Sequence, residues 1–214
     1  MSDKQKDYIK TILGLAVLAL GFYLMGNVNM HIGKLQEYTL LAFSTVGATL
    51  IFGKTWLLWF RFPQGKFIKI VFLALVLNIL WSTMGGIIIQ LIFGMSGHHA
   101  NSAVGDFGLL LFIPLMLVGE ELFSITILET FRKWGWSFWL ASLCSAIIFG
   151  IIHFQTYYGG NILRTVLQIL LIQGGARLIF NYVYQKTRSV WASWTVHLLF
   201  DLIPLTLMPL ILHR

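Results

Sequence analysis

Five acidic or imidazole side chains lie inside apolar stretches of the sequence, where ionisable groups are costly. Glu120 and Glu121 are adjacent within IPLMLVGEELFSITIL, and His153 lies near the end of AIIFGIIHF. His197 and Asp201 are four residues apart in VWASWTVHLLFDLI. An ionisable residue inside a membrane helix costs at least about 2.5–3.5 kcal/mol on insertion scales, so it usually has a function. These five residues are therefore the candidates for chemistry.

Side chains of these types are sufficient for hydrolysis. A glutamate can act as a general base on water, and an imidazole can orient that water or share its proton. A second polar pair can stabilise the oxyanion of a tetrahedral intermediate. Alternatively, Glu120, His153 and His197 could hold a divalent metal such as Zn²⁺, whose bound water becomes the nucleophile. The spacing of these residues does not decide between a metal-bound water and a water activated without metal. The sequence lacks H-E-x-x-H, the usual zinc-protease motif on a helix, and G-x-S-x-G, the motif of serine hydrolases.

Each candidate also has a purely structural interpretation. Adjacent glutamates project about 100° apart on a helix, so one can face a cavity while the other contacts a supporting partner; both could instead lie at a helix end and reach the interface. His153 could be an interfacial histidine. The i, i+4 spacing places His197 and Asp201 on one helix face, which also suits a structural His–Asp pair.

A sixth ionisable residue, Arg177, lies in LLIQGGARLIFNY and should be buried and paired. At 1.5 Å per residue, its depth in the predicted helix is similar to that of Glu120. The alternative is a role in helix packing, with Gly174 and Gly175 permitting close approach. The tandem His98–His99 is interpreted as a pair of exposed loop residues, with adventitious metal binding as the minor option.

Composition indicates a polytopic membrane protein. Of the 214 residues, 57% are hydrophobic and 11% are charged, whereas about a quarter of a soluble domain is charged. The net charge is +7, but Lys and Arg fall in short segments between apolar runs, which is typical of membrane topology and argues against nucleic acid as a partner. A single cysteine, Cys144, excludes an internal disulfide.

The apolar runs predict an all-α integral membrane protein, a polytopic bundle of about eight transmembrane helices. One domain covers residues 1–214, with a catalytic core at about 106–202. The runs are too long for barrel strands and lack a period of two. Basic residues concentrate in alternate connecting segments, which predicts that both termini are cytoplasmic. The predicted helices are 9–28, 38–53, 68–94, 107–128, 136–154, 162–184, 189–202 and 204–213.

Three of these polar motifs resemble the CPBP family, which includes the type II CAAX prenyl endopeptidases and the bacterial Abi proteins. That family's pattern is EExxxR, then FxxxH, then HxxxN or HxxxD, each on a different transmembrane helix. Glu120-Glu121 supply the first two letters, FGIIH ends in His153, and HLLFD runs from His197 to Asp201. The resemblance covers roughly residues 119–202.

The resemblance implies roles for these residues. Glu120 would be the base with His153, Glu121 would support it, and His197 with Asp201 would shape the oxyanion site or complete a metal site. The protein would be an intramembrane (metallo)endopeptidase that cuts a peptide or membrane-protein substrate within the lipid bilayer. Its small size favours a bacterial plasma-membrane protein, in peptide maturation or bacteriocin self-immunity.

The sequence departs from the family pattern at one position. The arginine of EExxxR falls on Ile125. We therefore expect Arg177 to pair with Glu121 or Glu120 in its place, with Arg132 as an alternative. The missing arginine also permits a non-catalytic membrane scaffold that binds a sensor kinase or toxin receptor. A small transporter with a proton path is disfavoured, because no inverted repeat is visible.

Overall fold

The structure is a computed structural model, and it describes residues 1–28, 30–94, 108 and 111–203. These residues form helices and connecting segments without a strand, which confirms the all-helical prediction for this part of the chain. The predicted helix 204–213 lies outside the described residues. The helices are α1 (Asp3–Asn27), α2 (Thr39–Phe52), α3 (Phe67–Phe93), α4 (Ile113–Lys133), α5 (Phe138–Ile152), α6 (Phe154–Tyr157), α7 (Ile162–Gln168), α8 (Gly175–Thr187) and α9 (Val190–Leu202).

Short 3₁₀ and π-helical segments connect some of these helices. Two 3₁₀ segments, Gly33–Tyr38 and Thr55–Phe60, flank α2. A π-helical segment, Ile169–Gly174, joins α7 to α8, so that Ile162–Thr187 forms one long interrupted helix. Among the described residues, this helix, Asp3–Gly26 and Phe67–Phe93 are long and apolar enough to cross a membrane. The helical membrane protein is thus supported, whereas the count of about eight spans stays a prediction.

The boundaries of α4 differ most from the prediction of 107–128. The helix begins at Ile113, with Pro114 in its first turn, where a missing N–H costs nothing. It continues through polar residues to Lys133 and ends before Gly135, whose φ is +87°. A helix ends where local backbone signals such as this glycine stop it, and hydropathy alone does not locate that point. The prediction therefore ended the helix at residue 128, where the apolar run ends, and α4 continues to Lys133.

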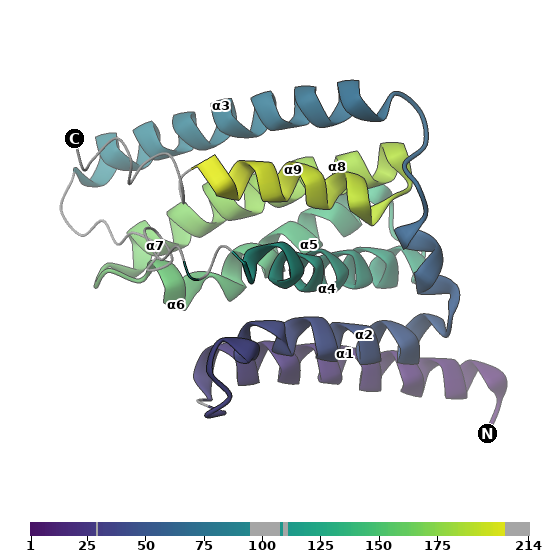
Figure 1. Ribbon diagram of the computed structural model, residues 1–214. Coiled ribbons are helices and arrows are strands. Elements are labelled where there is room, and N and C mark those ends of the chain that lie inside the picture. Colours follow the sequence, from purple (N-terminus) through teal and green to yellow (C-terminus); the bar gives the residue numbers. More distant parts are fainter. Residues whose placement is uncertain (29, 95–107, 109–110, 204–214) are drawn as a thin grey trace.

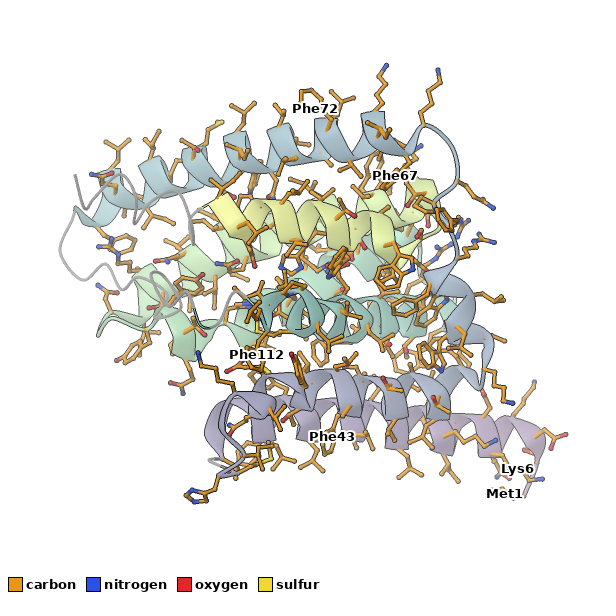
Figure 2. The ribbon with its side chains drawn as sticks, viewed as in Figure 1. Met1, Lys6, Phe43, Phe67, Phe72 and Phe112 are labelled. Carbon is orange, nitrogen blue, oxygen red and sulfur yellow. The ribbon has the colours of Figure 1, made fainter. Side chains whose placement is uncertain are left out.

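The helices pack in layers (Figure 1). The antiparallel pair α1 and α2 forms one side, α4 and α5 form the middle, and α8, α9 and α3 form the other side. Figure 2 shows Phe43 on α2, whose side chain fills the space beside Gly21 of α1. The backbones of α2 and α4 also touch, because a Cβ on Gly119 would lie 2.8 Å from the Leu41 nitrogen. Gly119 precedes the two glutamates, so this contact fixes their place in the bundle.

The basic ends of several helices gather at one end of the bundle. Lys133 of α4 forms a 2.7 Å ion pair with Asp7 of α1. Arg132 donates to Gln185 of α8 at 2.8 Å. The segment that follows the second 3₁₀ turn meets the end of α8, where the Gln64 N–H donates to the Thr187 carbonyl. This clustering is what a single cytoplasmic face requires, and the orientation itself stays a prediction.

Candidate active site

All five candidate residues meet at one place between α4, α5 and α9. The Glu120 Oε2 atom lies 4.0 Å from His153 Nε2 and 3.8 Å from His197 Nε2. His197 Nε2 also lies 3.6 Å from Asp201 Oδ2. Glu120 is therefore placed between two imidazoles that come from different helices. His153, for which an interfacial position was the alternative, reaches this cluster from the C-terminal end of α5.

Glu121 points into a second, fully buried environment. Arg177 Nη1 lies 2.6 Å from Glu121 Oε1, and Arg177 Nη2 lies 3.1 Å from Glu121 Oε2. Both side chains have no exposed surface. The expected pairing of Arg177 with one glutamate is thus present, as a two-pronged ion pair. Arg132 instead contacts Glu129 and Gln185 near the end of α4.

Hydrogen bonds assign the proton on each imidazole. His153 Nδ1 lies 2.7 Å from the Phe149 carbonyl, and His197 Nδ1 lies 3.0 Å from Glu121 Oε1. A carbonyl or carboxylate oxygen only accepts, so each Nδ1 carries a hydrogen and donates it. Both histidines therefore turn Nε2 toward Glu120, where it can exchange a proton.

Two aromatic rings hold the histidines and the arginine in place. Phe149 lies 4.7 Å from His153 and 5.9 Å from His197, measured between ring centroids. Phe180 stacks on His197 at 4.6 Å. The Arg177 guanidinium carbon lies 5.6 Å and 5.2 Å from the Phe149 and Phe180 centroids. The Phe of FxxxH thus packs on both imidazoles, which explains its place in the motif.

Sequence reasoning missed two polar residues behind the site. Arg177 Nε donates to Asn181 Oδ1 at 2.9 Å, and Asn181 Nδ2 donates to Ser142 Oγ at 3.0 Å. Both Asn181 and Ser142 are fully buried. The i, i+4 spacing of Arg177 and Asn181 could have indicated their contact. Ser142 comes from α5, and no sequence pattern links it to α8.

The π-helical segment sets the approach of α8 to α3. Within it, the Leu171 carbonyl accepts a 2.7 Å hydrogen bond from the Trp81 indole of α3. The next residue after the segment is Gly175, where an added Cβ would overlap the same indole. The packing role considered for this glycine is therefore correct, and it coexists with the pairing of Arg177. Such π segments frequently accompany functional sites.

Exposure separates the site into a sealed part and an accessible part. The Glu121 and Arg177 side chains are 0% exposed. The exposed fractions are 11% for Glu120, 19% for His153 and 31% for Asp201. The exposed surface of the cluster therefore belongs mainly to these last three residues. The sealed pair can only support them.

The three candidate metal ligands converge, but at distances longer than a metal site requires. Zinc bound at 2.0–2.1 Å in a tetrahedron places its ligand atoms about 3.3 Å apart. Glu120 Oε2 is 3.8–4.0 Å from the two Nε2 atoms of His153 and His197. Over the described part of the chain, no group of three or more His, Cys, Asp or Glu is arranged to hold a metal. His98 and His99 lie outside that part.

The fold and the site together define a polytopic membrane protein with a buried cluster of carboxylates and imidazoles. Residues 103–203 match the model of the family described as type II CAAX prenyl endopeptidase Rce1-like. This segment is somewhat under half of the chain, and its match confirms the resemblance to the CPBP family that the three motifs carry. No curated protein and no solved structure matches the chain.

Proposed function

We propose that this protein is an intramembrane endopeptidase in which Glu120 activates a water molecule. The observation that carries the proposal is the convergence of His153 Nε2 and His197 Nε2 on Glu120 Oε2, at 4.0 and 3.8 Å. These separations exceed hydrogen-bond length, so a bridging water is the natural way to connect the groups. The match of residues 103–203 to a family of CAAX prenyl endopeptidases supports the same reaction class.

The proton transfers of the proposed reaction use Glu120 and His153, which lie at the accessible side of the site. Glu120 takes a proton from the water as its oxygen adds to the scissile carbonyl carbon. The carbonyl electrons move onto oxygen, which forms the oxyanion. When the oxyanion collapses, the C–N bond breaks and the amine leaves with the proton held by Glu120. His153 Nε2 shares that proton between the two steps, because it faces the same carboxylate oxygen.

His197 is the proposed donor to the oxyanion. Its Nδ1–H is fixed on Glu121, which Arg177 in turn neutralises. Its Nε2 lies 3.6 Å from Asp201, whose carboxylate favours a proton on that nitrogen. An imidazolium held in this orientation stabilises developing negative charge without reorganising during the reaction. The sealed ion pair therefore acts by positioning His197.

The metal route would use Glu120, His153 and His197, and a bound Zn²⁺ would lower the pKa of its water. The atoms as placed do not fit such a site, so no step above depends on one.

The finer functional proposal concerns substrate and setting. We propose a peptide or membrane-associated protein as the substrate, and the plasma membrane of a bacterium as the location. Maturation of a secreted peptide or self-immunity against a bacteriocin would use such an activity. The catalytic core would lie at about 106–202 within a single domain, since Glu120, Glu121, His153, His197 and Asp201 all fall in that range.

A non-catalytic scaffold that binds a sensor kinase or toxin receptor is the second candidate. Ile125, in place of the motif arginine, favours it. This side chain is fully buried and packs with Leu128, Ala141 and Tyr184. The ion pair between Arg177 and Glu121 argues instead for a retained catalytic site. In this pair a positive charge from α8 neutralises the Glu121 carboxylate on α4.

The substitution Glu120→Gln tests the two candidates. Peptide ends in the membrane fraction of cells expressing each form are compared by mass spectrometry. Loss of the general base should reduce the protein-dependent peptide ends at least about 10²-fold. Glu129→Gln is the matched control, because Glu129 lies on the same helix but contacts Arg132 away from the site. Undiminished cleavage by an inserted Glu120→Gln protein would eliminate the protease proposal and favour the scaffold.

A further inference from the structure

An apolar groove runs along the outside of the bundle between α3 and α8. Its volume is about 550 Å³. Residues of α3 and α8 line it, together with Trp139 of α5. The lining residues are Ile70, Leu73, Ala74, Leu77, Trp139, Leu178, Ile179, Tyr182, Val183 and Lys186.

The groove lies on the opposite face of α8 from the candidate active site. Arg177 and Asn181 face the glutamates. At 100° per residue, Leu178 and Tyr182 are turned about 100–140° away from Arg177, and Lys186 is turned about 180° away. A ligand in the groove would therefore not reach Glu120. The groove is a separate site and does not depend on the proposed protease activity.

One end of the groove is basic. Lys186 lies in the last turn of α8, where its Nζ is 5.4 Å from the Tyr182 ring centroid. Lys66 and Lys69 lie at the start of α3, at the same end of the bundle (Figure 1). None of these three lysines forms an ion pair with a carboxylate within the described ranges. This end thus carries positive charge that the protein itself does not neutralise.

Aromatic side chains complete the amphipathic character of this end. Trp139 stacks on Tyr182, with ring centroids 6.2 Å apart and an interplanar angle of 15°. Tryptophan and tyrosine are enriched at the depth of lipid headgroups. Figure 2 shows Phe72 on the outer side of α3, where it is 63% exposed, and Phe67 near α9. The groove is therefore apolar along most of its length and becomes aromatic and basic at the end that would lie near the lipid headgroups.

We propose that this groove binds one anionic phospholipid. The acyl chains would lie against Leu73, Leu77 and Leu178, and the phosphate would contact Lys186. An anionic headgroup is favoured over a zwitterionic one, because unneutralised lysines attract the phosphate and repel a choline or ethanolamine cation. Basic recesses between membrane helices bind anionic headgroups in this way.

The test uses the full-length protein in detergent with phosphatidylglycerol or phosphatidylcholine as the probe. Bound lipid is counted by native mass spectrometry, and Tm is measured with each lipid. We expect phosphatidylglycerol to bind more tightly and raise Tm more. Lys186→Gln should weaken phosphatidylglycerol binding about five-fold. Lys54→Gln, an exposed lysine at the same end that does not line the groove, should leave binding unchanged.

A second pair of variants tests the apolar part. Leu73 and Leu80 are both exposed residues of α3, but only Leu73 lines the groove. Leu73→Trp should fill the groove and weaken binding of both lipids, whereas Leu80→Trp should not. Equal binding of the two lipids would overturn the proposal, as would an equal loss in Lys54→Gln. Undiminished binding in Leu73→Trp would also overturn it, since the lipid would then lie elsewhere.

Discussion

Arg177 on α8 and Glu121 on α4 form a two-pronged ion pair at 2.6 and 3.1 Å in the sealed interior of the bundle. The motif arginine of the CPBP family would lie on the same helix as the glutamates, four residues after Glu121. In this chain Ile125 occupies that position, and the positive charge comes from a different helix. The pair therefore joins two elements of the fold as well as neutralising a buried carboxylate.

Removal of the arginine should strongly destabilise the protein. Arg177→Met leaves the buried Glu121 carboxylate without its guanidinium partner and with only the hydrogen bond from His197, and breaking a buried pair in this way costs about 3–5 kcal/mol. Arg177→Lys should cost less, because it keeps the charge but loses the fork geometry. Thermal unfolding in detergent measures both. Arg177→Met combined with Glu121→Gln should recover part of the loss, and an unchanged Tm in the single variant would contradict the prediction.

His153 and Glu121 should separate activity from stability. The His153 Nδ1–H donates to a carbonyl of its own helix, and its side chain is partly exposed. His153→Gln should therefore lower activity by about 10²–10⁴-fold while Tm changes little. Glu121→Gln should lower Tm, because Arg177 loses its carboxylate. Equal losses of Tm in the two variants would show that His153 serves folding and not catalysis.

Hydropathy and charge placed most of the helices, because a membrane helix needs a long apolar run with polar breaks at its ends. The 3.6-residue period also placed His197 and Asp201 on one face of α9. Whether His153 reaches the other candidate residues was less predictable from the sequence. The tilt of α5 and the position of the short helix α6 that follows it are set by packing. The π-helical segment left no trace in composition, because its residues are as apolar as those around them.

The sealed network behind Glu121 shows a similar limit. Arg177 was recognisable as a charge inside an apolar run. Asn181 and Ser142 were not, since an amide and a hydroxyl are common within membrane helices and their contact joins residues 39 positions apart. Only the crossing of α5 and α8 brings them together.

Asn181 should be coupled energetically to Ser142. Asn181→Leu leaves Arg177 Nε and Ser142 Oγ buried without their partner, which should cost about 1–3 kcal/mol. Ser142→Ala removes one hydroxyl and should cost less. The double variant should lose less than the sum of the single ones, by at least about 0.5 kcal/mol. Additive losses of unfolding free energy would show that the two side chains act independently.

Two glycines offer a matched test of the α3–α8 contact. A methyl group on Gly175 would overlap the Trp81 indole, whereas one on Gly86 of α3 would meet nothing within 4 Å. Gly175→Ala should therefore lower the free energy of unfolding by about 1–3 kcal/mol through overpacking. Gly86→Ala should leave it unchanged or raise it slightly, because alanine favours the helix. A neutral Gly175→Ala variant would show that α3 can move away from α8 without cost.

Activity should survive metal chelation. The Glu120 carboxylate oxygen lies 3.8–4.0 Å from the two imidazole Nε2 atoms, which is wider than the ligand spacing around zinc. The same spacing suits a water molecule bridged by hydrogen bonds. Purified protein treated with 1,10-phenanthroline should therefore cleave substrate at the rate of untreated protein, and a non-chelating phenanthroline isomer serves as the control. If chelation abolished cleavage and added Zn²⁺ restored it, Glu120, His153 and His197 would have to move together to hold the ion, and the water activated by Glu120 alone would no longer explain the reaction.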